Sequence, residues 1–235
     1  MSDCTLDVRG TCTLEIVGAR PRPEEGSPLA GPVGLRLAPG ELALVDAPDR
    51  ALARALAELC AGLPALAGGV VRFLGRDWTA LSRREAEALR GRIGLAPDDG
   101  GWLPHLSVAE GMLLAARHHG IEDAGPLERR ADALARHFGL DGVPEETPHE
   151  LSRLDLARAG CARAFLQRPA LLLLESPREI EAADALVEPL RALLEPALAE
   201  GVTAVWATRS RIAWEDPSFP ATRRFHLGAG GLVAA

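Results

Sequence analysis

The sequence is poor in aromatic residues and contains no tyrosine. Phe, Trp and Tyr together account for 4% of the 235 residues. Proteins that bind single-stranded nucleic acid stack the bases on exposed aromatic rings, and few such rings are present here. The net charge of -7 also argues against an evenly basic surface. We therefore expect no nucleic-acid partner, and we interpret the arginines at 83–84 and 90–92 as a solvated face.

Cysteine and histidine are too scattered to indicate a metal site. The four cysteines form no C-x-x-C pair and lie far apart, at Cys4, Cys12, Cys60 and Cys161. This spacing argues against a disulfide framework and indicates reduced, buried thiols. The six histidines show no ligand spacing apart from one adjacent pair, and neighbours on a helix do not face each other. We predict no metal site.

Long apolar runs are absent as well. No run approaches the roughly 20 residues that a membrane-spanning helix needs, and no apolar segment of the kind found in a secretory signal follows Met1. The chain is therefore expected to be cytosolic or held at a membrane by partners. Its length suits one domain with a subdomain.

Short apolar strands alternate with helices along most of the chain. Continuous apolar runs at 42–45, 171–174 and 203–207 are typical of strands buried on both faces of a parallel sheet. Segments 5–8 and 13–17 alternate like edge strands, and segment 182–198 has the pattern of one long helix. Between about 107 and 150 the pattern is helical only. The alternation predicts an α/β fold with a mostly parallel sheet and an inserted helical subdomain.

Segment 40–54 has the strand, loop and helix order of a phosphate-binding loop, but not the residues. Such a loop reads G-x-x-x-x-G-K-[ST], because glycine amides cradle the phosphates and the lysine reaches the β- and γ-phosphates. The fixed positions here hold Ala47, Leu52, Ala53 and Arg54. The full set of degenerate nucleotide-binding positions is Ala47, Pro48, Asp49, Arg50, Leu52, Ala53 and Arg54. The sequence thus points to a nucleotide-binding fold and, at the same place, against nucleotide chemistry.

Six segments in order resemble the ATP-binding subunit of ABC transporters, over nearly the whole chain. They are 39–63, R-I-G-L-A-P at 92–97, W-L-P-H-L-S-V-A-E at 102–110, 148–164 beginning P-H-E-L-S, 167–177 ending L-L-L-L-E-S-P, and 201–209. The resemblance implies an α/β fold with a P-loop NTPase (RecA-like) core, an antiparallel β edge subdomain and an inserted α-helical subdomain. We expect one domain over 1–235, with 1–98 and 156–235 in the core and 99–155 in the helical subdomain.

The resemblance also shows which family positions have changed. Pro177 fixes the register, so Glu175 stands at the metal-side Asp position and Ser176 at the catalytic Glu position. Asp98 stands at the glutamine-loop position and Arg209 at the switch-histidine position. The signature L-S-G-G-Q reads Leu151, Ser152, Arg153, Leu154 and Asp155. Serine is a poor general base at neutral pH, so no catalytic residue is expected to be intact.

These changes predict a pseudo-ATPase. Phosphoryl transfer depends on positioning and on electrostatic stabilisation by Lys, Mg²⁺ and backbone donors, and each lost contributor costs roughly 100-fold or more in rate. No cofactor is expected, and ATP with Mg²⁺ would bind only if residual binding survives. Arg209 either forms an ion pair with Glu175 or Asp98 across the vacated site or is simply exposed.

The resemblance implies an integral-membrane permease as partner, with the chain on the inner face of the cell membrane as a homodimer or heterodimer. Trp102 and Leu103 are candidates for the permease-docking groove, the alternative being ordinary packing. Segment 104–120 is similar to phospholipid or solvent-resistance transport systems. The expected role is structural or regulatory. Two alternatives remain: an active but unconventional ABC ATPase, and a stand-alone module that binds another anion through Arg50 and Arg54.

Overall fold

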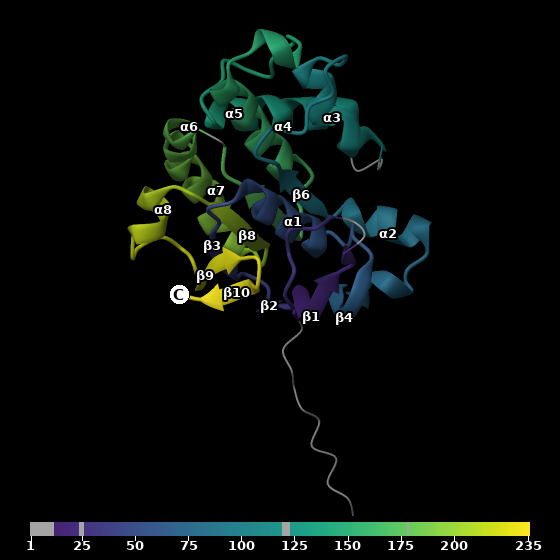
Figure 1. The fold of residues 1–235 in the computed structure, drawn as a ribbon. Helices are drawn as coiled ribbons and strands as arrows, with labels where there is room; N and C mark the ends of the chain where they lie inside the picture. The colour runs from purple at the N-terminus through teal and green to yellow at the C-terminus, as the bar shows by residue number, and fades with distance from the viewer. Residues whose placement is uncertain (1–11, 24–25, 119–122, 178) are drawn as a thin grey trace, which may run out of the picture.

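The computed structural model describes residues 12–23, 26–118, 123–177 and 179–235. Two sheets and a helical lobe make up this part of the chain (Figure 1). The larger sheet has six strands in the order β10-β9-β3-β8-β7-β6. Their bounds are β3 Leu42–Asp46, β6 Ile93–Ala96, β7 Leu171–Glu175, β8 Thr203–Thr208, β9 Arg223–Gly228 and β10 Gly231–Ala234. All neighbouring pairs are parallel except the β9–β10 hairpin.

The three apolar runs lie at the centre of this sheet, as predicted. Strands β7 and β8 are buried along their whole length, and β3 is buried except at its last residue. Such burial on both faces explains why these segments are continuously apolar rather than alternating. Trp206 of β8 lies in the core beside Phe219, with ring centroids 5.3 Å apart.

The second sheet is antiparallel and has the order β2-β1-β4-β5. Its strands are β1 Leu14–Pro21, β2 Val33–Leu37, β4 Leu66–Phe73 and β5 Arg76–Asp77. Because β1 pairs with β2 on one side and β4 on the other, the prediction of an edge strand at 13–17 is wrong. The strand expected at 5–8 lies outside the described residues. Helix α1, Arg50–Cys60, packs between the two sheets and shares one core with both.

Helix α2, Arg83–Arg90, flanks the antiparallel sheet and begins directly after Ser82. The side chain of Ser82 accepts from the Glu85 backbone N–H, and the Glu85 carboxylate accepts from the Ser82 N–H at 2.9 Å. This reciprocal cap satisfies amides that a helix start leaves free. A 3₁₀ turn, Trp78–Ala80, precedes it.

The helical lobe rises above the sheets (Figure 1). It comprises α3 Val108–His118, α4 Ala124–His137, the 3₁₀ turn Pro148–Glu150 and α5 Arg153–Leu166. Helix α5 packs against α3 and α4 on one side and against β6 on the other, so it joins the lobe to the six-stranded sheet. The predicted architecture of sheet core, antiparallel sheet and helical insertion is confirmed.

The long helix predicted over 182–198 is wrong, because the segment forms two helices. Helix α6, Ile180–Ala185, and helix α7, Val187–Ala199, meet at Leu186. Pro189 is the third residue of α7. It has no N–H to donate to the Ala185 carbonyl, and its ring would collide with that group in a continuous helix. A last short helix, α8, covers Arg211–Glu215. Within the described ranges, no helix is both long and apolar enough to cross a bilayer.

Candidate functional site

The site lies where the parallel strands of the larger sheet end. Strand β3 ends at Asp46 and leads into α1, β7 ends at Glu175, and β6 ends two residues before Asp98. Since the carboxyl ends of parallel strands meet at one edge, three segments distant in the sequence come together there. The resemblance to ABC ATP-binding subunits implied a shared site for these segments.

The segment that should form a phosphate loop is mostly helix. Only Ala47, Pro48 and Asp49 separate β3 from α1, because the helix already begins at Arg50. Asp49 caps the helix: its side chain accepts from the Ala51 N–H at 2.8 Å. Its carbonyl accepts from the Ala53 N–H at 3.1 Å. Amides used inside a helix or by its cap are not free to surround a phosphate.

The side chains at the former glycine and lysine positions face the protein core. Ala47, Leu52 and Ala53 are 2%, 7% and 8% exposed and belong to the core between the two sheets. Pro48 is exposed. Ala53, at the position of the family lysine, carries no charge. The sequence contains no lysine, so all 26 Lys and Arg residues are arginine.

Arg54 extends from α1 onto the carboxylates at the strand ends. Its Nε lies 3.2 Å from both carboxylate oxygens of Glu175. Its Nη2 lies 3.1 Å from Asp98 Oδ1 and 3.2 Å from Asp99 Oδ1. Arg50, one helical turn earlier, donates through Nε to Asp98. Three carboxylates therefore share two guanidinium groups.

The two central carboxylates are buried. The side chains of Glu175 and Asp98 are only 2% and 5% exposed, whereas that of Arg54 is 36% exposed. Burial raises the pKa of Glu175, and the Arg54 charge and hydrogen bonds oppose that rise. Burial alone would lower the pKa of Arg54, but the attraction of Glu175 and the aspartates raises it above its usual value. The cluster is thus a mutually stabilised group of charges rather than a set of free ligands.

The structure also places Arg209 and Ser176. Of the two alternatives stated for Arg209, the ion pair is wrong, because the side chain is partly exposed and pairs with neither Glu175 nor Asp98. Ser176 is buried, and its hydroxyl donates to Thr208 Oγ1 at 3.1 Å. Arg54 was the missed partner. The available signal was the spacing of Arg50 and Arg54, because residues four apart share one helix face.

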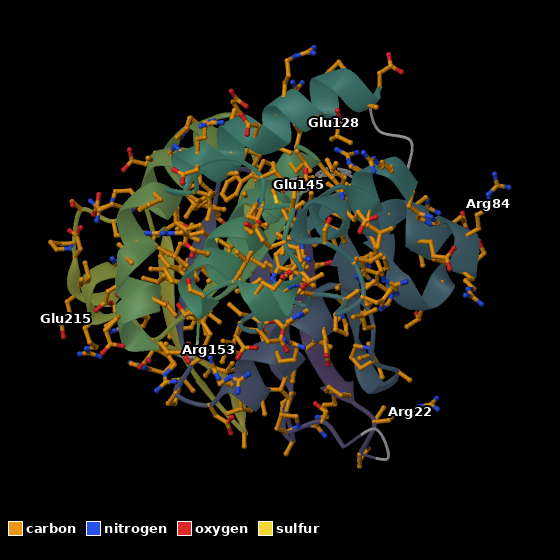
Figure 2. All side chains as sticks on the ribbon, turned by 90° about the horizontal axis from the view of Figure 1, so that it is seen from above. Arg22, Arg84, Glu128, Glu145, Arg153 and Glu215 are labelled. Atoms are coloured by element: carbon orange, nitrogen blue, oxygen red, sulfur yellow. The ribbon has the colours of Figure 1, made fainter. Side chains whose placement is uncertain are left out.

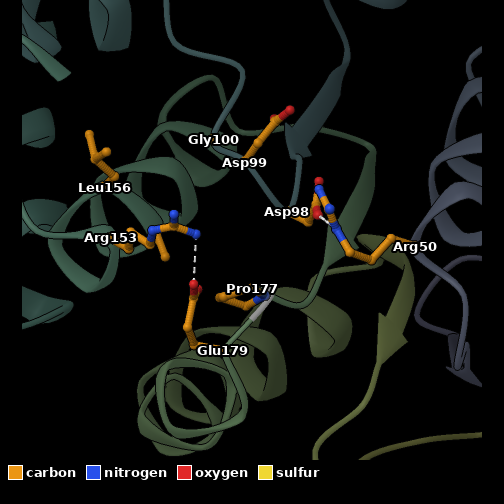
Figure 3. A pocket seen from close by; sticks show the side chains of 9 residues that line it. Arg50, Asp98, Asp99, Gly100, Arg153, Leu156, Pro177 and Glu179 are labelled. Carbon is orange, nitrogen blue, oxygen red and sulfur yellow. Dashed lines mark hydrogen bonds and ion pairs between the residues drawn. The ribbon is translucent and has the colours of Figure 1, made fainter. Parts of the chain in front are cut away.

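The signature segment forms a capped helix start. Ser152 caps α5: its Oγ accepts from the Asp155 N–H at 3.1 Å and donates to the Asp155 carboxylate at 2.7 Å. Arg153 forms an ion pair with Glu179 at 2.7 Å (Figure 3). Leu151 and Leu154 are half-buried. The S-x-x-D pattern at 152–155 is a helix-start signal that our sequence reasoning overlooked.

A cavity of about 280 Å³ separates this helix start from the arginine–carboxylate cluster. Its lining includes Arg50, Asp98 and Asp99 on one side and Arg153 and Glu179 on the other (Figure 3). The cationic groups on both sides already have carboxylate partners. In the part of the chain that the structure describes, no group of three or more His, Cys, Asp or Glu side chains is arranged to hold a metal ion.

Trp102 packs against a half-buried arginine, Arg163. The Arg163 guanidinium lies 4.4 Å from the Trp102 ring centroid and donates to the Gly100 carbonyl at 2.5 Å. Burial lowers the pKa of Arg163 to about 10. Leu103 is 43% exposed. The 98–102 link is therefore held by α1 at one end and by α5 at the other.

Next to this link lies an apolar groove of about 600 Å³. It is lined by β6, the outermost strand of the larger sheet, and by α3, with Leu95 and Leu114 on its walls. Neither Trp102 nor Leu103 lines the groove, although Arg163 does. We call this surface the β6–α3 groove.

The sequence is similar to known proteins of one family. A family model described as "ABC transporter" matches residues 54–179, which begins after most of the phosphate-loop positions. The chain is 33% identical over 158 residues to the lipoprotein-releasing system ATP-binding protein LolD 1 of Rhodopirellula baltica, covering 66% of this chain and 69% of that protein. It is 31% identical over 176 residues to the cell division ATP-binding protein FtsE of Escherichia coli K12, covering 75% and 78%.

Solved structures agree on the fold. A dimeric structure of a bacterial ABC transporter cassette superposes with a TM-score of 0.77 at 18% identity, covering 93% of this chain and 96% of that one. A post-hydrolysis state of that cassette bound to ADP and phosphate gives a TM-score of 0.75. The fold and the arrangement of strand ends are those of a P-loop nucleotide-binding cassette. The chain belongs to the ABC transporter family, as one of its ATP-binding subunits.

Proposed function

We propose that this chain is a non-hydrolysing member of the ATP-binding subunits, acting as a structural or regulatory subunit on a membrane permease. One observation carries the proposal: the Arg54 guanidinium lies within 3.2 Å of Glu175 and of Asp98. By family resemblance, Arg54 stands at the position of the hydroxyl that binds Mg²⁺. A fixed cation there opposes the binding of a second one.

The residues present do not fit Mg²⁺ and a triphosphate. Mg²⁺ binds through carboxylates, water and substrate phosphates in a strict octahedral geometry. To admit it, Arg54 would have to leave two carboxylates that are almost fully buried. Arg54 would then lose these carboxylate partners and lie beside a divalent cation of the same sign of charge. Ala53 supplies no cation for the phosphates, and the amides of the first turn of α1 are used in part by Asp49. We therefore derive no hydrolytic step for this chain.

The same contacts suit a structural role. Arg50 and Arg54 neutralise the carboxylates at the strand ends, as a bound metal ion would otherwise have to do. Arg54 and Arg163 also fasten the 98–102 link to α1 and α5. The helical lobe is thereby joined to the sheet core by the chain's own side chains, without a nucleotide.

The partners follow from the family. The relatives are named for a lipoprotein-releasing system and for cell division, and the similar solved cassette is dimeric. We propose a homodimer or heterodimer on the cytoplasmic face of the membrane, with the β6–α3 groove receiving a permease segment and Leu103 at its margin. We favour a lipid-linked molecule as the transported substrate. This rests on the resemblance of segment 104–120 to phospholipid transport systems and on the similarity to a protein named for lipoprotein release.

Thermal unfolding with millimolar Mg-ATP tests the central claim. We expect no change in melting temperature, because the site does not bind Mg-ATP. Binding with a micromolar Kd would be seen clearly, since it would add about 4 kcal/mol of stability at a thousandfold excess. A matched variant that restores the loop, with Ala47→Gly, Leu52→Gly, Ala53→Lys and Arg54→Ser, should bind if these side chains are what blocks the site. Turnover by the unmodified chain that Glu175→Gln abolishes would show an active, unconventional ATPase and overturn the proposal.

A further inference from the structure

A second concave surface lies at the opposite edge of the larger sheet, away from the arginine–carboxylate cluster. It is a groove of about 690 Å³ whose lining includes Arg92, Ala170 and Val202. These residues directly precede β6, β7 and β8. The groove therefore sits at the amino ends of the parallel strands, between α4, α7 and the end of α5. We call it the basic groove.

Arginines dominate the charge of the basic groove. Arg92, Arg130 and Arg168 line it, and Glu200 is the one carboxylate among the lining residues. Arg130 is held in place by donating to the Leu166 carbonyl at 2.9 Å. Arg92 and Arg168 are exposed, and neither pairs with an acidic side chain of the described ranges. In a chain of net charge -7, this local excess of positive charge is unusual.

The floor of the basic groove is apolar. Phe165 at the end of α5 and Leu193 of α7 line it, and both are half-buried at the margin of the core. A ligand that only neutralised Arg92 and Arg168 would therefore leave this apolar floor uncovered. A complementary ligand carries negative charge beside an apolar group.

Arg168 is the residue that follows the C-cap of α5, Gln167. Arg168 has a φ of 49°, in the left-handed region. Residues other than glycine rarely adopt this conformation, and a following proline further disfavours helical values. Arg168 is nevertheless followed by Pro169, and it presents a long cationic side chain at the groove. A left-handed residue followed by proline is a common way to end a helix, so this φ sets the position of Arg168 at the end of α5.

We propose that the basic groove binds an acidic peptide segment of a partner protein, with carboxylates on Arg92 and Arg168 and an apolar side chain on the Phe165–Leu193 floor. A groove enclosed by helices and loops favours a peptide over a planar membrane, which would meet only the outermost side chains. The shortage of exposed aromatic rings argues against nucleic acid. This surface is separate from both the degenerate site and the β6–α3 groove, so the proposal does not depend on nucleotide binding.

The test is fluorescence anisotropy with the full chain and a labelled twelve-residue probe of alternating Glu-Glu and Leu-Leu pairs. The controls are a Glu-Ser peptide without apolar residues and a Lys-Leu peptide. We expect saturable binding of the Glu-Leu probe that weakens with salt, because the contacts are charged. The double variant Arg92→Glu with Arg168→Glu should bind it at least about tenfold more weakly.

A matched double variant, Arg20→Glu with Arg84→Glu, changes the net charge equally at exposed arginines elsewhere. Arg84 projects from the far side of α2 (Figure 2). Binding by this control should fall less than twofold. Arg168→Gly removes the charge at a φ that glycine accepts readily, so its loss of binding cannot be attributed to misfolding.

Three results would overturn the proposal. They are no binding of the Glu-Leu probe, equal losses in the two double variants, and binding of the Glu-Ser or Lys-Leu peptide as tight as that of the probe. Phosphatidylglycerol vesicles serve as the competing ligand. Vesicle binding that depends on Arg92 and Arg168 while the probe fails to bind would assign the groove to lipid instead.

Discussion

Replacing Arg54 by methionine keeps an aliphatic stem and deletes the guanidinium group. Glu175 and Asp98 then lose a cation that they share at 3.2 and 3.1 Å. Asp98 retains Arg50, whereas Glu175 is left with the Asp98 N–H as its remaining contact among those described here. The substitution therefore acts mainly on Glu175, whose buried carboxylate loses the ion pair that offsets its desolvation penalty.

The size of the effect follows from burial. Removing one partner of a fully buried ion pair costs about 3–5 kcal/mol. Since the Arg54 side chain is 36% exposed, solvent screens part of the interaction, and we expect a loss of about 2 kcal/mol at pH 7.5. For a chain of this length that lowers the melting temperature by about 4–8 °C.

The loss should depend on pH in a defined direction. Burial already raises the pKa of Glu175 above its usual value, and removing Arg54 raises it further. The folded variant then holds a proton that the unfolded chain releases, so its stability falls as pH rises from the unfolded pKa through the folded one. The loss of folding stability caused by Arg54→Met should be smallest at about pH 5 and should reach its full size at alkaline pH.

Urea unfolding followed by circular dichroism at pH 5.0 and 7.5 measures both quantities. Arg54→Met with Glu175→Gln should recover part of the loss, because the second change removes the unpaired charge. Arg153→Met is the matched control: its pair with Glu179 is exposed, with side chains 70% and 38% accessible, and should contribute less than about 0.5 kcal/mol. A cost for Arg54→Met below about 0.5 kcal/mol at pH 7.5, or one equal at both pH values, would refute this account of the cluster.

Two further substitutions test the local structure by the same unfolding assay. Gly62 has a φ of 63°, and a Cβ there would lie 2.2 Å from Trp78 Cγ, so Gly62→Ala should lose about 3 kcal/mol or more, whereas Gly34→Ala, with nothing within 4 Å, should be nearly neutral. Equal effects at the two glycines would contradict the packing described. Ser82→Ala removes the cap that Glu85 completes and should cost about 1 kcal/mol, while Ser82→Gly should cost only a few tenths; no difference between them would argue against the cap.

Much of the fold could be read from local patterns. The continuous apolar runs identified β3, β7 and β8, because strands covered on both faces cannot alternate. The break at Leu186 was also indicated by Pro189, because proline is favoured in the first turn of a helix and disfavoured further along, but the apolar periodicity on both sides concealed it.

Sequence could not decide the pairing of β1 or the partners of the arginines. An alternating segment looks alike whether one or both of its edges are paired, and β1 gained its second neighbour from a strand about 50 residues away. Arg209 and Arg54 were equally plausible partners of Glu175 on charge alone. Helix α1 decides between them, because it places Arg54 on the same face as Arg50, next to the carboxylates.

The sequence alone determined the family, the order of the strands' motifs and the loss of glycine and lysine from the phosphate loop, because these depend on which residues stand at which intervals. The tertiary structure decided what occupies the altered site. Arg54 and Glu175 are 121 positions apart, and only the packing of α1 against β7 brings them within hydrogen-bonding distance. Because the energy of a charge pair falls with distance, it depends on this packing, and the packing cannot be read from the residues on either side of Arg54 or Glu175.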